Sequence, residues 1–76
     1  MNELDSMVAS VNNGNAILPG VEKLKYTFLN VHGFWVTRFD VCAGRGFNDR
    51  DSFVEITGYQ AAIDYLKKTG WHWTKK

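Results

Sequence analysis

Apolar and polar residues alternate through residues 23–42, which contain two β-prone runs separated by His32 and Gly33. A tight turn at these two residues predicts an antiparallel hairpin in which Val31 lies opposite Phe34. Counting outward from the turn fixes the other partners, because successive side chains of a strand alternate between the two faces of the sheet. One face is then strongly apolar, and we expect it to pack on the core; it includes Leu24, Tyr26, Phe39 and Val41.

The opposite face of the predicted hairpin is divided between polar and apolar side chains. Lys25 and Asp40 lie across from each other near its open end, where their charges can pair. The turn end of this face is apolar and consists of Leu29, Val31, Phe34 and Val36. These four side chains form an exposed patch unless an N-terminal helix or a partner covers them.

The N-terminal segment has apolar residues at the spacing of one helical face, namely Leu4, Met7, Val8 and Val11. Asn2 can cap the start of this helix, and Gly14 can end it. We therefore expect a short amphipathic helix, followed by a loop or turn over residues 12–20.

The strongest helical pattern covers residues 57–70, where Thr57 and Gln60 fit a capping box and Gly70 fits a helix stop. Its expected apolar face contains Tyr59, Ala62, Ile63 and Leu66. Residues 52–56 precede it and have the β-branched and aromatic content of a short strand.

The chain ends in an alternating segment, in which Trp71 and Trp73 share one side of a short edge strand and His72 faces the other. The predicted element order is therefore α-β-β-β-α-β. This order predicts an α+β two-layer domain: a three- to four-stranded antiparallel sheet, one long C-terminal helix and a short N-terminal helix. We expect one domain over residues 1–76, with a helix and loop over 1–20 and the sheet-plus-helix core over 23–76.

Composition supports a folded protein, because 45% of the 76 residues are hydrophobic and 22% are charged. The net charge of +1 gives no overall field that would concentrate a polyanion. The single cysteine, Cys42, has no internal disulfide partner, and the start of the chain lacks the pattern of a signal peptide. We therefore expect a cytoplasmic protein, and no apolar run is long enough to predict a membrane span.

No catalytic or metal-binding pattern emerges from the sequence. Cys42 is expected in a strand as a small buried hydrophobe, and nothing places His32 or His72 near it as a base. Two distant histidines and one cysteine match no zinc spacing. We therefore expect no enzyme activity, no metal and no cofactor.

The loop over residues 43–51 offers an alternative function, the binding of single-stranded nucleic acid. Arg45, Phe47 and Arg50 can combine charge with stacking on a base, helped by the lysines at the C-terminus. Asp49 and Asp51 nearly cancel that charge, which makes a solvated loop the simpler expectation.

Aromatic content favours protein binding as the leading hypothesis. Three Trp, three Tyr and five Phe residues compete for a core that is too small to bury all of them fully. The predicted binding residues are aromatic, histidine and arginine side chains near loops, turns or an edge: Arg38, Arg45, Phe47, Arg50, Trp71, His72 and Trp73. At least one of the two C-terminal tryptophans is expected to cover the core instead.

These residues predict a non-enzymatic module that docks on a protein partner. Small chains without a catalytic constellation are often accessory or inhibitory factors of phages or mobile elements, and we expect such a role here. An edge strand also pairs readily with another chain, so a homodimer through the terminal strand is a further expectation.

Overall fold

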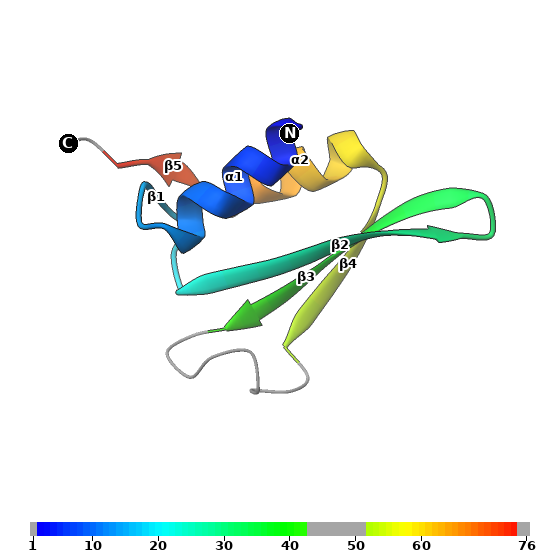
Figure 1. The fold of residues 1–76 in the computed structure, drawn as a ribbon, viewed down its shortest axis with the longest axis horizontal. Helices are drawn as coiled ribbons and strands as arrows, with labels where there is room; N and C mark the ends of the chain where they lie inside the picture. The colour runs from blue at the N-terminus through cyan, green and yellow to red at the C-terminus, as the bar shows by residue number, and fades with distance from the viewer. Residues whose placement is uncertain (1, 43–51, 75–76) are drawn as a thin grey trace.

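The computed structural model describes residues 2–42 and 52–74, which form two helices and five strands (Figure 1). In chain order these elements are α1 (Glu3–Asn12), β1 (Ala16–Ile17), β2 (Lys23–Val31), β3 (Phe34–Cys42), β4 (Phe53–Thr57), α2 (Tyr59–Lys68) and β5 (His72–Trp73). The α+β class and the predicted order of the main helices and strands are confirmed.

The main sheet has three antiparallel strands in the order β2-β3-β4. The predicted hairpin register is confirmed at every position, from Val31 opposite Phe34 to Lys25 opposite Asp40. The turn between the two strands explains why. His32 has a φ of 53° and Gly33 a φ of 81°, the pair of positive angles that a type I′ turn requires.

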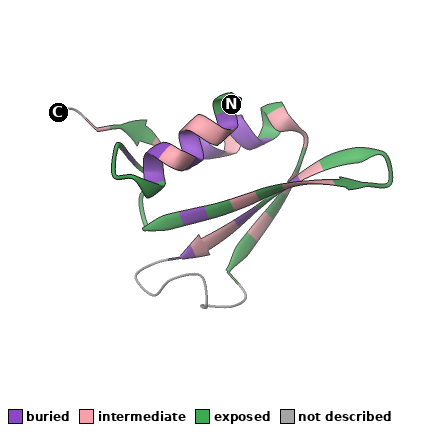
Figure 2. Ribbon diagram, in the orientation of Figure 1, coloured by how far each residue is buried: buried purple, intermediate pink, exposed green. Residues whose placement is uncertain are grey.

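Both helices cover the same face of this sheet, so the domain has two layers (Figure 1). Alternate residues of β2 and β3 point into the space between the layers, where Leu24, Thr37 and Phe39 are almost fully buried. Figure 2 shows the buried positions concentrated on the helices and on the strand segments that face them. The expected apolar stripes of both helices contribute to this core, which contains Leu4, Met7, Val8, Val11, Ala62, Ile63 and Leu66.

Helix α1 begins and ends as the sequence predicts. The Asn2 side chain accepts a hydrogen bond from the backbone N–H of Asp5 at 2.7 Å. The helix ends at Asn12, and Gly14 follows with a φ of 80°. The covered face is the one bearing Leu24, so α1 does not cover the apolar patch at the turn end of the hairpin.

Helix α2 differs from the prediction in length and in its start. It has 10 residues, the same as α1, so the expectation of one long and one short helix is wrong. The capping box is also wrong: Thr57 belongs to β4, Gly58 is the N-cap, and Gln60 donates to Asp64. Gly58 has a φ of 97°, which turns the chain directly from the strand into the helix.

The C-terminal strand forms a second, smaller sheet. We expected β5 beside the edge of the main sheet, but it pairs with β1, a strand in the segment expected to be a loop. Trp73 lies opposite Ala16, and the backbone N–H of Thr74 donates to the carbonyl of Asn15 at 3.1 Å. This pairing holds the C-terminal segment against the turn that follows α1, beside the helices (Figure 1).

Candidate functional site

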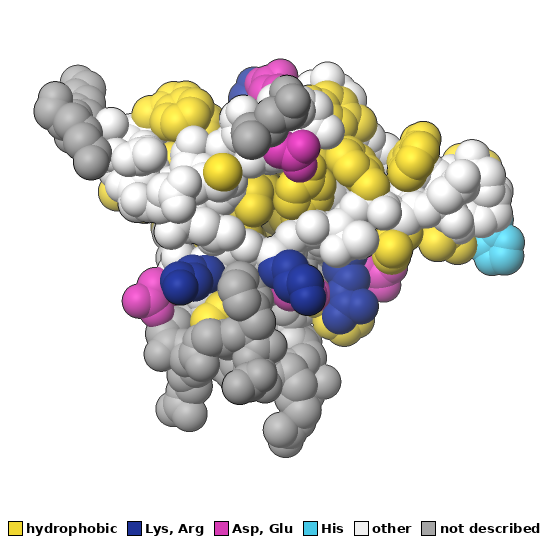
Figure 3. Space-filling view, in the orientation of Figure 1, with side chains coloured by type: hydrophobic (Ala, Val, Ile, Leu, Met, Phe, Trp, Pro, Cys, Tyr) yellow, Lys and Arg dark blue, Asp and Glu magenta, His cyan; other side chains and the backbone are white. Residues whose placement is uncertain are grey.

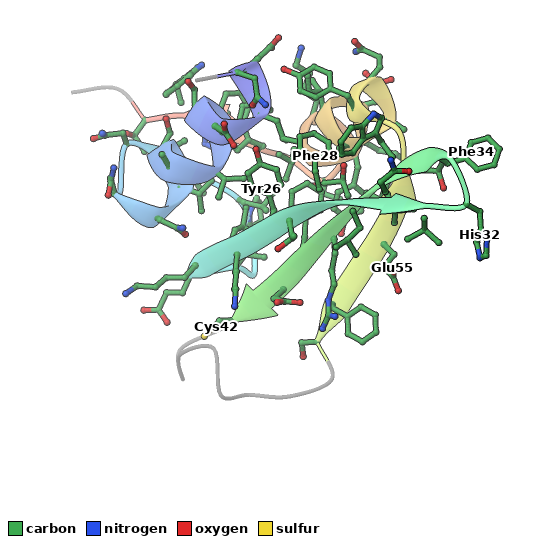
Figure 4. All side chains as sticks on the ribbon, turned by 45° about the vertical axis from the view of Figure 1, so that its right-hand side comes forward. Tyr26, Phe28, His32, Phe34, Cys42 and Glu55 are labelled. Carbon is green, nitrogen blue, oxygen red and sulfur yellow. The ribbon has the colours of Figure 1, made fainter. Side chains whose placement is uncertain are left out.

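The end of the β2–β3 hairpin, residues 29–36, extends beyond the rest of the fold (Figure 1). Strand β4 pairs only with residues 36–40 of β3, so the last part of the hairpin is a two-stranded ribbon. This hairpin end exposes large apolar side chains: 41% of Val31, 64% of Phe34 and 57% of Trp35 are accessible to solvent. Figure 4 shows Phe34 pointing outward at the turn, with His32 beside it.

A shallow pocket of about 240 Å³ lies where the hairpin end meets α2, and Phe28, Trp35 and Tyr59 line it. The Phe28 ring stacks on Tyr59 at a centroid distance of 5.9 Å and meets Trp35 edge to face at 5.8 Å. The Tyr59 hydroxyl accepts a hydrogen bond from the backbone N–H of Leu4 at 3.3 Å, which fixes this ring against α1. In Figure 3, hydrophobic side chains continue from the helical layer toward the hairpin end. Trp35 is therefore continuous with aromatic side chains that pack on the core, whereas Phe34, the preceding residue of β3, points to the opposite face of the ribbon.

Arg38 lies on the sheet face that neither helix covers. Its Nε donates to Asp40 at 2.8 Å, and its guanidinium lies 4.3 Å from the centre of the Phe53 ring. The predicted pairing of Asp40 with Lys25 is replaced by this contact within β3. The pair remains solvent-exposed, so it holds the side chain in place while contributing little to stability.

The three predicted C-terminal residues divide between the core and the surface. Trp71 is half-buried and packs against the core, whereas 55% of Trp73 is exposed. The two rings meet edge to face at 4.9 Å, as expected for side chains on one side of a strand. Nδ1 of His72 lies 2.9 Å from the carbonyl oxygen of Gly70.

Arg45, Phe47 and Arg50 lie outside the described residues, so the predicted binding loop stays a prediction. The remaining predicted residues do not form one site. Arg38 belongs to the uncovered sheet face, and the C-terminal residues lie beside β1, away from the hairpin end (Figure 1). Phe34 was predicted to be exposed but was not included among the binding residues, although an apolar patch at a turn was the signal for it.

No catalytic arrangement is found in the parts of the chain that the structure describes. Cys42 is buried at one end of β3, while His32 lies in the turn at the other end (Figure 4). Within residues 2–42 and 52–74, no group of three His, Cys, Asp or Glu side chains has the geometry to hold a metal ion. Neither described helix is long and apolar enough to cross a membrane.

Comparison with models of protein families, with curated proteins and with solved structures found no match to this chain.

Proposed function

We propose that this chain is a non-enzymatic protein-binding module that docks on a protein partner through its hairpin end. The observation that carries this proposal is the exposure of Phe34 and Trp35 on a ribbon that projects beyond the rest of the fold. Aromatic side chains supply much of the binding energy at protein interfaces, and they do so best on a rigid support.

The support beneath Trp35 favours the same function. Trp35 contacts Phe28, which stacks on Tyr59, and Tyr59 is bonded to the backbone of α1. A partner that contacts Trp35 therefore meets a side chain that is already ordered, and little conformational entropy of this residue is lost on binding. The adjoining pocket offers a place for one apolar side chain of the partner.

The proposal includes an accessory or inhibitory role, of the kind that small phage or mobile-element proteins perform. It also includes a cytoplasmic location. A small module with an apolar surface and no catalytic arrangement among its described residues acts by occupying a surface of its partner. Its effect is then exerted on the activity of that partner.

The proposal is tested by capture from a lysate of the native host, with the immobilised wild-type chain compared with a Phe34→Ser/Trp35→Ser variant. Ile17→Ser serves as a matched control, because Ile17 is a similarly exposed apolar residue (46%) located on β1. Loss of two interface aromatics is expected to lower the affinity for the captured protein by at least about tenfold. Circular dichroism checks that both variants are folded.

Equal capture of the same protein by the wild type and the hairpin-end variant contradicts the proposal. Nuclease treatment of the lysate and a salt titration distinguish protein binding from the alternative function, the binding of single-stranded nucleic acid. A single-stranded nucleic-acid binder would lose affinity steeply as salt is raised, and its capture would depend on intact nucleic acid.

A further inference from the structure

Strand β2 is one edge of the main sheet, and its backbone groups alternate between pointing inward and outward. The residues flanking a two-residue turn form a hydrogen-bonded pair, so Val31, Leu29, Thr27 and Lys25 bond to β3. The residues that alternate with them, Leu24, Tyr26, Phe28 and Asn30, therefore direct their N–H and C=O groups away from β3.

The first of these outward positions is already occupied. The side-chain amide of Asn12 donates to the carbonyl of Leu24 and accepts from its N–H, both at 2.6 Å. This double contact takes the place of a neighbouring strand and confirms the outward direction of the backbone at Leu24. Among the described residues, no side chain or backbone group bonds the outward groups of Tyr26, Phe28 and Asn30.

The other edge of the sheet, β4, is protected by charge. The backbone N–H of Gly58 donates to the carbonyl of Trp35, and the N–H of Val41 donates to the carbonyl of Ser52. Alternate residues counted from these two bonds point toward β3, so Glu55, at the middle of β4, directs its backbone N–H and C=O away from β3. If β4 paired along its whole edge with β4 of a second copy in an antiparallel, symmetric way, the Glu55 residues of the two copies would lie opposite each other. Like charges that face each other across two strands are destabilising.

We propose that β2 pairs with β2 of a second copy of this chain, in an antiparallel register centred on Phe28. This register uses the three open residues of each copy, so that Tyr26 lies opposite Asn30 and Phe28 lies opposite Phe28. Six backbone hydrogen bonds then join two three-stranded sheets into one sheet of six strands. The proposed pairing replaces the expected dimer through the terminal strand, since β5 is engaged by β1.

The side chains of β2 suit a second copy of itself. The open residues Tyr26, Phe28 and Asn30 are uncharged, and no two charged residues lie opposite each other in this register. Lys25 lies opposite Val31, whose exposed side chain can cover the aliphatic stem of the lysine. The pairing uses the edge of β2 and does not rest on the docking function of the hairpin end.

The first test measures mass against concentration by sedimentation, for the wild type and for Asn30→Pro. Asn30 is exposed, and its N–H is not bonded by any described part of the chain, so proline removes two symmetry-related bonds of the dimer and none that the structure shows within the monomer. The expected result is a dissociation constant raised on the order of tenfold or more. Glu55→Pro is the matched control, because it removes an outward N–H from the opposite edge.

A second test uses charge and leaves the backbone unchanged. In the proposed register, Thr27 of one copy lies diagonally across from Thr27 of the other, at about 7 Å. Thr27 is exposed, so Thr27→Lys and Thr27→Glu are expected to leave the fold intact and each to weaken the dimer. An equimolar mixture of the two variants is expected to restore it as a heterodimer.

A wild-type chain that is monomeric up to about 1 mM overturns the proposal. A dimer that Glu55→Pro weakens as much as Asn30→Pro, or one in which the mixed Thr27 variants fail to recover, also overturns it.

Discussion

The buried hydroxyl of Thr37 is a polar group in the middle of an apolar core. Thr37 has no solvent exposure, and its Oγ1 has no hydrogen-bond partner among the residues that the structure describes. We predict that Thr37→Val leaves the protein as stable or makes it more stable, by up to about 1 kcal/mol, because it removes an unsatisfied group and keeps the branched shape. Urea unfolding followed by circular dichroism measures the difference.

Thr37→Ser is the informative control for this prediction. It keeps the hydroxyl and removes the methyl group, so it is expected to lower the free energy of unfolding by about 1 kcal/mol. A destabilising Thr37→Val would contradict the assignment and indicate that the hydroxyl has a partner in solution.

The contacts of single side chains were predicted only in part. The sequence placed Lys25 opposite Asp40 correctly, yet the carboxylate bonds to Arg38 on its own strand. Residues two apart on a strand share a face, and the longer arginine also rests on Phe53, a residue of β4. That third strand lies beyond a loop whose length hides the register from the sequence, so the pairing was not foreseeable.

The β2–β3 turn offers a prediction about the hairpin as a unit. His32 and Gly33 both have positive φ angles, and histidine is less suited than asparagine to the first position of a type I′ turn. We predict that His32→Asn raises the free energy of unfolding by a few tenths of a kcal/mol, whereas Gly33→Ala lowers it by roughly 1 kcal/mol. Chemical denaturation of both variants checks the opposite signs.

Both substitutions are at exposed positions, and a β-carbon on Gly33 would meet no heavy atom of the other described residues within 4 Å, its two chain neighbours aside. Any loss in Gly33→Ala therefore comes from the backbone angle and not from a clash. If the two variants shift stability in the same direction, the turn is not the element that sets this register.

Elements defined by local signals were predicted well, and those defined by distant partners were not. The hairpin register follows from two adjacent residues, and the end of α1 follows from Gly14. Strands β1 and β5 have two residues each, and each becomes a strand only by pairing across the length of the chain. The missed start of α2 has a similar origin, because β4 extends through Thr57 to complete its pairing with Val36.

The two C-terminal tryptophans connect the end of the chain to the rest of the domain, and they are expected to contribute unequally. Trp71 packs on the core, so Trp71→Ala is predicted to cost about 2 to 4 kcal/mol of unfolding free energy. Trp73 is mostly exposed and loses mainly its edge-to-face contact, so Trp73→Ala is predicted to cost roughly 1 kcal/mol. Thermal and urea unfolding measure both.

Trp71→Phe provides the control for this pair. Nε1 of Trp71 is buried and has no hydrogen-bond partner within residues 2–42 and 52–74, so the phenylalanine keeps much of the packing and removes an unsatisfied donor. It is expected to cost less than Trp71→Ala. Equal losses of unfolding free energy from Trp71→Ala and Trp73→Ala would contradict the prediction, because they would show that the core packing of Trp71 contributes no more than the surface contact of Trp73.

The candidate binding surface was predictable as a patch but not as a site. Alternation along β2 and β3 identified the apolar turn end that includes Phe34, while Trp35 lies on the opposite face, where the size of the chain implied only that some aromatics would be exposed. Which ones are exposed depends on how far β4 and the helices extend along the hairpin, and that is set by the packing of the whole domain. The sequence therefore favoured the C-terminal residues over Phe34 and Trp35.

The contact of Asn12 with Leu24 also bears on how this protein resists aggregation. The same amide anchors the end of α1 and occupies the first outward position of β2. If α1 separates from the sheet, a fourth residue of an edge rich in aromatic and β-branched side chains becomes available to other chains. Long edges of this composition are the templates on which fibrils grow. The Asn12 amide therefore adds a polar contact to the apolar packing of α1 and at the same time keeps one position of this edge from other chains.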